Sequence, residues 1–224
     1  MPRPILIAAG LGTALILAAG PATGDNRAAD FSAFEERLIN ADAVRVEFVI
    51  VSEGVLATDL LGSLDIRGEK ISLEADGTFG GSPVDLILAV SGTEISGGNL
   101  ALADASLQEF TIENPGAARE AVILGMTRMG LLHNLALLTG SRPPDRAAGG
   151  IRNWVKAANV HSASDGSLAF DIIVDGQDAA DAVVVLDARS LPERRDQTNR
   201  FPAGEMRVVE TYRVFEVVDG GAGD

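Results

Sequence analysis

Residues 60–90 read LLGSLDIRGEKISLEADGTFGGSPVDLILAV, and this stretch decides the fold class. Apolar and polar residues alternate along it, and glycines interrupt it at Gly68 and at Gly80-Gly81. A period of two is typical of strands that cover a core with one face, and glycine marks the turns between them. The stretch therefore predicts an antiparallel meander with one apolar and one solvated face.

The same pattern continues outward in both directions. Residues 44–51 alternate before the meander, and a second group of alternating segments follows residue 150. The predicted strands are 44–51, 55–66, 70–78, 84–90, 94–96, 151–162, 167–174, 179–186, 193–201 and 205–217, with Pro83 just before its strand. We expect no internal repeat and no linker, and therefore one domain.

A short helix is predicted ahead of the first strand. Phe31, Phe34, Leu38 and Ala41 recur at the three-and-four spacing of an amphipathic helix over residues 30–41. Asp30 is the expected cap of its first turn.

A second helix is predicted between the two groups of strands. It runs from Pro115 to Leu138 in about six turns, with proline at its first position and Gly140 at its end. Most of its circumference is apolar, so we expect it to be enclosed on more than one side.

The first 24 residues have the order of a secretory signal. Arg3 precedes an apolar stretch over residues 5–19, and small residues lead to Gly24, after which we expect cleavage. An uncleaved membrane anchor is the alternative, because a span needs only about 20 apolar residues. We expect a periplasmic or secreted protein with one domain over residues 25–218 and a C-terminal tail over 219–224.

The absence of cysteine and the negative net charge limit which molecules the protein is expected to bind. The sequence contains no cysteine, so it has neither a disulfide nor a lipid attachment site after the signal. Without Arg3, 17 basic and 32 acidic residues remain, a formal charge of −15. Nucleic acid and anionic membrane surfaces repel such a chain, whereas a basic partner is favoured.

Two strings resemble a known family. Residues 185–192, VLDARSLP, resemble the strand, aspartate turn and Leu-Pro of the LolA-like and LppX-like lipoprotein carriers, and residues 62–67, GSLDIR, resemble their early Gly-x-Leu strand. Residues 70–78 lack the family's aromatic strand, and 92–99 lack its Trp-x-Tyr string, which indicates a distant member. The resemblance implies an α+β, mainly antiparallel fold: a curved, incomplete β-barrel covered by helices over residues 28–218.

The resemblance also implies a function. An incomplete barrel covered by helices leaves an apolar cavity for acyl chains, which binds a lipid or an acylated lipoprotein for transport or sensing and needs no cofactor. The candidate ligand-binding residues are Phe48, Ile50, Leu64, Ile71, Leu73, Leu86, Leu88, Met126, Met129, Leu132 and Leu135. The alternative is that these side chains pack against one another as an ordinary core.

A second hypothesis is an envelope regulatory or scaffold module that binds a protein partner on the same fold, such as an envelope membrane protein. An enzyme is not expected, because the sequence has no Gly-x-Ser-x-Gly elbow, no cysteine nucleophile and no phosphate-binding loop. His133 and His161 are the only histidines and lie far apart, so no metal site is expected, and His133 is expected to belong to the core.

Pairs of charged residues have a structural explanation. Glu35 and Glu36 are expected on the solvated surface, as are Asp178 and Asp181. Two of the arginines in residues 193–201, at positions 194 and 200, share one face of their strand. These two arginines are expected to pair with Glu205 and Glu210 across the turn, or to bind a lipid phosphate.

Overall fold

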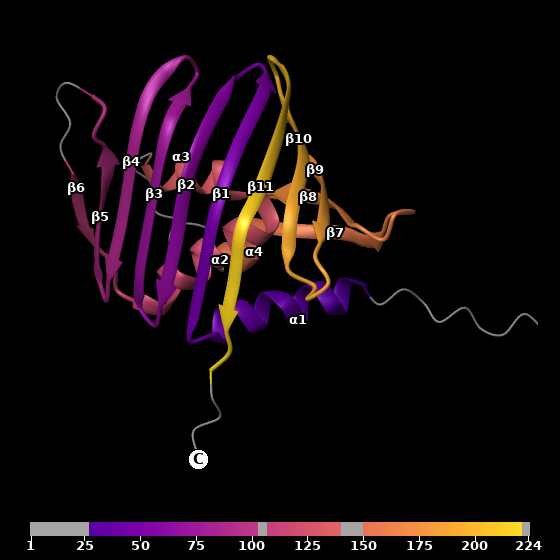
Figure 1. Cartoon of the computed structure of the whole chain (residues 1–224), viewed down its shortest axis with the longest axis horizontal. Coiled ribbons are helices and arrows are strands. Elements are labelled where there is room, and N and C mark those ends of the chain that lie inside the picture. Colours follow the sequence, from indigo (N-terminus) through magenta and orange to yellow (C-terminus); the bar gives the residue numbers. More distant parts are fainter. Residues whose placement is uncertain (1–26, 103–106, 140–149, 221–224) are drawn as a thin grey trace, which may run out of the picture.

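Eleven strands form one antiparallel sheet in the order β6-β5-β4-β3-β2-β1-β11-β10-β9-β8-β7 (Figure 1). The computed structural model describes residues 27–102, 107–139 and 150–220. The strands are β1 Ala43–Gly54, β2 Thr58–Arg67, β3 Lys70–Phe79, β4 Ser82–Ser91, β5 Glu94–Asn99, β6 Gln108–Thr111, β7 Val155–Ser162, β8 Leu168–Val174, β9 Gln177–Leu186, β10 Pro192–Phe201 and β11 Gly204–Val218. The helices are α1 Arg27–Asn40, α2 Pro115–Met129, α3 Leu131–Thr139 and α4 Ile151–Trp154. The expected fold class, α+β with an open antiparallel sheet, is confirmed.

The connectivity explains why one face of the sheet is covered. Two meanders, β1–β6 and β7–β11, join through the pairing of β1 with β11 at the centre. The edge strands β6 and β7 do not pair with each other, so the sheet remains open. Because α2, α3 and α4 connect one edge to the other, they must cross the sheet, and they lie behind it in Figure 1.

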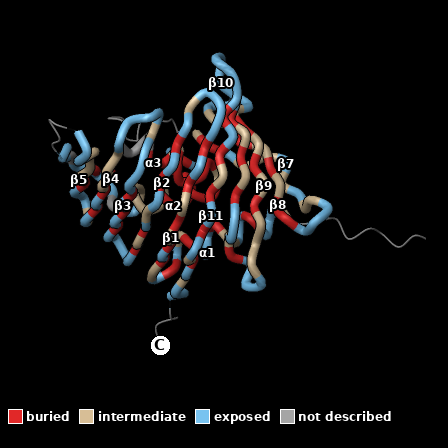
Figure 2. The backbone as a smooth tube through the Cα atoms, turned by 45° about the horizontal axis from the view of Figure 1, so that its top comes forward, coloured by how far each residue is buried: buried red, intermediate tan, exposed pale blue. Residues whose placement is uncertain are grey.

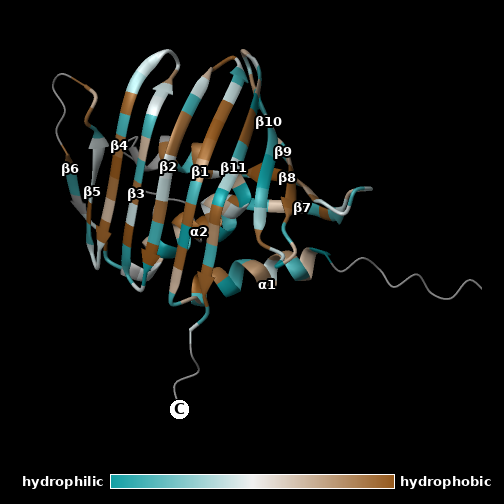
Figure 3. Cartoon of the chain, viewed as in Figure 1, coloured by the Kyte–Doolittle hydropathy of each residue, from teal (hydrophilic) through white to brown (hydrophobic). Residues whose placement is uncertain are grey.

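The predicted period of two is confirmed along the central strands. In β1, the alternate residues Val44, Val46, Phe48 and Ile50 are buried, while those between them are exposed or half-buried. Figure 2 shows this alternation of buried and exposed positions, and Figure 3 shows the matching alternation of hydropathy. The buried residues point toward the helices, and we call this side of the sheet the inner face. The residues between them point to the other side, the outer face.

Arg119 fixes α1 to α2. Its side chain lies in α2 and donates to carbonyl oxygens at the end of α1, including that of Ile39 at 2.9 Å, and to that of Ala41. It also donates to the carbonyl oxygen of Gly68, in the turn after β2, at 2.7 Å. One guanidinium therefore satisfies carbonyls that the last turn of α1 leaves without a helical partner.

The prediction of one long helix from Pro115 to Leu138 is wrong in one respect. Pro115 does begin it, and the side chain of Asn114 caps it by accepting from the Gly116 N–H at 3.0 Å. The helix ends at Met129, however, and α3 begins at Leu131, because Gly130 has a φ of +84° that an α-helix does not tolerate. The predicted end at Gly140 lies outside the described residues.

Other boundaries also differ from the prediction. Helix α1 begins at Arg27, so Asp30 lies in its first turn and is not its cap. Residues 55–57 form a turn before β2, and Pro83 lies inside β4. Residues 151–154 form the short helix α4, and β6 was not predicted. Most of these differences concern the ends of elements, where a periodic pattern is weakest.

The motif at residues 185–192 forms as expected. Strand β9 ends at Leu186 and β10 begins at Pro192. Between them, one carboxylate oxygen of Asp187 accepts from the N–H of Arg189 at 2.8 Å and of Leu191 at 2.9 Å. The bond from the Leu191 N–H is the largest cause that lowers the pKa of Asp187, so the carboxylate stays ionised and holds the turn.

The predicted signal, residues 1–24, lies outside the described residues, as does most of the tail. Among the helices that the structure describes, none has the length and apolar character needed to cross a membrane.

Gly62 provides a test of the inner-face packing. A Cβ at this position would collide with the carbonyl oxygen of Glu74 and lie 2.6 Å from Cζ of Phe48, whose ring covers the glycine. We expect Gly62→Ala to lower the free energy of unfolding by about 1–3 kcal/mol, as overpacking does. Urea denaturation followed by fluorescence of Trp154, the single tryptophan, measures it.

Ser63→Ala is the matched control, because Ser63 is the next residue and is exposed on the outer face. Its effect should stay within about 0.5 kcal/mol. Equal losses in both variants would contradict the assignment of the two faces.

Candidate functional site

All eleven residues predicted to line an apolar cavity are buried. Ten of them belong to one core cluster between the β1–β5 half of the sheet and helices α2 and α3, and Met129 belongs to a second cluster. The structure thus brings the predicted set together on the inner face. Their role in ligand binding stays a prediction.

Strand β10 separates the two clusters. The first cluster includes β11 through residues such as Val208 and Phe215, and the second includes β8 and β9 through residues such as Phe170 and Val184. Between them, the inner face of β10 carries three buried polar side chains, those of Arg195, Gln197 and Asn199. The interior therefore has two apolar compartments with a polar line between them.

Arg195 ties this polar line to the end of α2. Its guanidinium donates to the carbonyl oxygens of Thr127 at 2.8 Å and Arg128 at 2.7 Å, and to the side-chain oxygen of Gln197 at 2.8 Å. It also lies 5.4 Å from the ring centroid of Phe170. The last carbonyls of a helix carry partial negative charge, so a buried cation is stabilised there.

Glu210 places a buried anion at the start of α3, as Arg195 places a buried cation at the end of α2. It is the cross-strand partner of Arg195, and its carboxylate accepts from the Leu132 N–H at 3.0 Å and from the Tyr212 hydroxyl at 2.6 Å. Burial, and next the Glu210 carboxylate, raise the pKa of Tyr212 well above its ordinary value, so the phenol remains a donor. A Cβ at Gly130 would lie 2.7 Å from this carboxylate, so glycine fits the break for steric reasons too.

A buried ion pair joins α1 to α2. Both carboxylate oxygens of Glu35 accept from Arg128, at 2.6 and 2.7 Å, and the Thr127 hydroxyl donates to the same carboxylate at 2.8 Å. Arg128 also donates to the carbonyl oxygen of Val155 in β7 at 2.7 Å. The prediction that Glu35 belongs to the solvated surface is therefore wrong, because α1 turns this residue toward α2.

A small cavity lies where these contacts meet. It has a volume of about 20 Å³ and is lined by Phe34, Met126, Thr127, Val184, Pro192, Arg195, Tyr212 and Phe215. That volume holds about one water molecule. At this place the interior is filled by side chains.

Arg194 and Arg200, which the sequence singled out, form ion pairs on the surface of the sheet. Arg194 and Arg200 do share the outer face, but Arg194 pairs with Asp196 at 2.7 Å, and Arg200 pairs with Asp178 at 2.9 Å and with Asp181. The expected pairing with Glu205 and Glu210 is wrong, because β9 and the same strand offer nearer carboxylates.

His133 is half-buried at the start of α3. Burial, and next the charge of Arg195, lower its pKa, so the imidazole is neutral at neutral pH. Among the described residues, no three His, Asp or Glu side chains gather in a way that could hold a metal ion.

The polar line on β10 was missed by the sequence reasoning. Residues 193–201 are polar on both faces, so alternation does not show which side is buried. The neighbouring strand carried a usable signal, because Glu210 falls in the same alternate row as Val208 and Tyr212. A carboxylate in an apolar row predicts a buried partner.

Arg195 and Arg194 are adjacent residues on opposite faces, which makes a matched test. We expect Arg195→Met to lower the free energy of unfolding by about 3–5 kcal/mol, because the carbonyl oxygens of Thr127 and Arg128 lose their donor and the buried carboxylate of Glu210, on the facing strand position, loses the nearby positive charge. Arg194→Met should lower it by less than about 1 kcal/mol. Urea denaturation measures both.

A double variant separates charge from packing. Adding Glu210→Gln to Arg195→Met should restore part of the loss, because the uncompensated carboxylate is removed. If the two losses simply add, the two residues do not act as a pair.

Comparisons with known proteins concern the fold. No protein-family model and no curated protein matches the chain by sequence. A LolA superfamily protein from Nitrosomonas europaea is similar in structure at 11% identity and a TM-score of 0.46, over 87% of this chain and 94% of that one. A chain of the Pseudomonas aeruginosa MucA/MucB complex is similar at 14% identity and 0.36, over 87% and 58%. A DUF1329 family protein from Desulfovibrio piger is similar at 8% identity and 0.35, over 89% and 96%. The architecture, two meanders in one open sheet whose inner face is crossed by helices, is the one expected from the resemblance to LolA-like carriers.

Proposed function

We propose that this protein is a periplasmic lipid- or lipoprotein-binding protein that holds acyl chains between helices α2 and α3 and the inner face of β1–β5, for transport or sensing. The ligand is a lipid or the acylated end of a lipoprotein. No chemical step is involved, so binding is reversible.

One observation carries this proposal. Buried charges in the described residues lie on α1, β10 and β11, whereas the buried side chains of β1–β5 include only two polar ones, Ser52 and Thr58. Neither of these two is ionisable. An acyl chain placed against this half of the sheet would therefore meet apolar side chains and no buried charge.

The free energy of moving an acyl chain from water into an apolar interior is large enough to drive binding. Each methylene group moved from water into an apolar interior contributes about 0.8 kcal/mol, so a chain of 16 carbons gains on the order of 10 kcal/mol before entropic losses. Met126, at the centre of the helical cover, is buried and unbranched, and methionine adapts its shape to varied neighbours.

Thr58 adds a polar contact at one end of this surface. Its hydroxyl oxygen is buried and has no hydrogen-bond partner, whereas the hydroxyl of nearby Ser52 donates to the Leu56 carbonyl oxygen at 2.9 Å. A buried hydroxyl without a partner is unfavourable in the free protein. An ester or amide carbonyl of the ligand would give it an acceptor.

A tryptophan placed on the inner face tests acyl-chain binding. In a Trp154→Phe background, we expect Leu88→Trp fluorescence to be quenched by a fatty acid brominated in mid-chain, because Leu88 is buried in the inner-face cluster. Leu86→Trp, nearer the edge of the core, serves if the first variant unfolds. The measurement is a titration at fixed protein concentration.

Ala89→Trp is the matched control, since residue 89 follows directly and is exposed on the outer face. It should show no quenching beyond that of free tryptophan. Equal quenching of the two tryptophans, or none at either inner position, would rule out the proposed binding surface.

Thr58→Val tests the polar contact. We expect it to raise the free energy of unfolding by up to about 1 kcal/mol, because it removes the unpaired hydroxyl, and to weaken binding of an acyl ester several-fold. Ser52→Ala should instead lower stability by about 1 kcal/mol, because it removes a bond that is made. A Thr58→Val variant that binds the ester as tightly as the native protein would exclude this role.

A further inference from the structure

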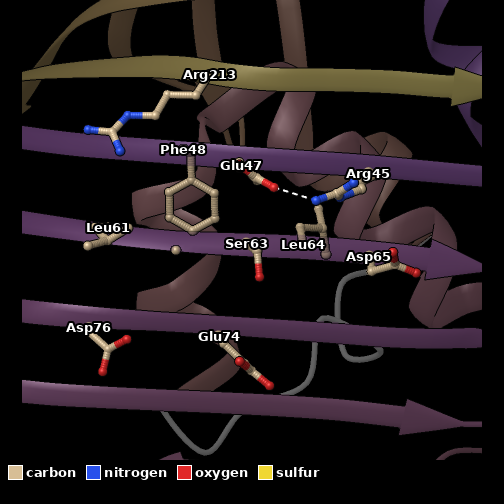
Figure 4. Close-up of a pocket in the computed structure, with 11 residues that line it drawn as sticks. Arg45, Glu47, Phe48, Leu61, Ser63, Leu64, Asp65, Glu74, Asp76 and Arg213 are labelled. Atoms are coloured by element: carbon tan, nitrogen blue, oxygen red, sulfur yellow. Dashed lines mark hydrogen bonds and ion pairs between the residues drawn. The ribbon is translucent and has the colours of Figure 1, made fainter.

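The outer face of the sheet has no covering element in the part of the chain that the structure describes. Helices α2, α3 and α4 lie on the inner side, behind the strands in Figure 1, and Figure 4 shows helical ribbon behind the strands that carry the labelled polar side chains. An uncovered sheet face with apolar side chains at its centre is a place for a partner to pack.

Apolar side chains lie at the centre of this face. Leu61 on β2 is 55% exposed and Val51 on β1 is 48% exposed. Val49 is the cross-strand partner of Leu61, and Val209 of β11 is that of Val51. These four residues form one patch, which we call the outer apolar patch.

Carboxylates border the patch on one side. Asp59 on β2, Asp76 on β3 and Asp85 on β4 all point outward, and none forms an ion pair with another described residue. Asp76 pairs in register with both Leu61 and Asp85, so two like charges lie directly opposite each other. Such a pair is unfavourable in the free protein and is relieved by an added cation.

A hollow adjoins both features. It has a volume of about 370 Å³ and is lined on the outer face by Arg45, Arg213, Glu47, Leu61, Ser63, Asp65, Glu74 and Asp76 (Figure 4). Arg45 already pairs with Glu47 at 2.5 Å, whereas Glu74 forms no ion pair with another described residue. Ser63 forms its floor because this small side chain stands in register between Glu47 and Glu74. Strands lie about 4.8 Å apart, so these two carboxylates rise on either side of the serine, about 10 Å apart at their Cα atoms.

We propose that the outer face docks a basic amphipathic helix of a partner protein. Its apolar residues pack on the outer apolar patch, one long Lys or Arg side chain enters the hollow and meets the unpaired carboxylate of Glu74, and others meet Asp76 and Asp85. The overall charge of −14 draws such a helix toward the protein at long range. Because this surface lies on the side of the sheet opposite to the proposed acyl site, the two ligands do not compete.

A synthetic peptide tests the proposal. The probe is a fluorescein-labelled helix of about 18 residues with leucine on one face and lysine on the other, and its match has glutamate in place of lysine. We expect fluorescence anisotropy to show binding of the lysine peptide, weakening as salt is raised, and no binding of the glutamate peptide.

Variants locate the binding surface. The combined variant Asp59→Asn, Asp76→Asn, Asp85→Asn should weaken binding of the lysine peptide about tenfold, and Leu61→Ser several-fold. The control Glu113→Gln, Asp175→Asn, Glu193→Gln removes the same charge at exposed positions away from the patch and should change the affinity less than twofold.

Three results would overturn the proposal. One is the absence of binding to the native protein. A second is an equal loss in the patch and control variants, which would leave net charge as the only attraction. The third is a Leu61→Ser variant with unchanged affinity. Quenching of the Leu88→Trp variant by brominated fatty acid should persist with the peptide bound, so the two sites succeed or fail separately.

Discussion

Arg195 and Glu210 hold the helical cover on the sheet. Arg195 reaches from β10 to carbonyls in the last turn of α2, and Glu210 reaches from β11 to the Leu132 N–H in the first turn of α3, on either side of the break at Gly130. A buried cation and a buried anion thus each meet the helix end of opposite polarity. Without them, two helix ends would face an apolar interior with unsatisfied groups. The position of the cover, and with it the shape of the interior, depends on this arrangement.

The strand that carries Arg195 also divides the apolar interior into two compartments. On one side of β10, the inner face of β1–β5 is apolar and contains no buried charge among the described residues. On the other side, a smaller core packs α4 and Phe31 against β8 and β9. The acyl chain that we propose as ligand would meet no buried charge in the first compartment, which the polar line of β10 bounds. The outer face is different, because apolar and acidic side chains there meet solvent side by side.

Much of the fold could be predicted because the alternation of apolar and polar residues along a strand shows which of its faces is buried. The alternation in β1–β4 placed Phe48, Leu64, Leu73 and Leu88 on the inner face, where they are buried. The break at Gly130 could not be predicted, because a single glycine within an apolar helix is often tolerated and the carboxylate that accepts from the first turn of α3 comes from Glu210 on a distant strand. The inner face of β10 could not be identified either, since polar side chains on both faces carry no periodic signal. Glu35 was misplaced because its partner Arg128 is distant in the sequence.

The sequence by itself determined the class of the protein: an acidic chain without cysteine, built from two meanders and an apolar helical segment, with an apolar and a solvated face on each central strand. These properties are local, because they depend on residues two to four positions apart. Only the tertiary structure decided that β1 pairs with β11, that the helices cross from one edge of the sheet to the other, and that Arg195 meets the end of α2. Those outcomes join residues far apart along the chain. They are selected by the free energy of burying apolar surface from both meanders together, and by the need to pair every charged group that is buried with it, and no local pattern records either.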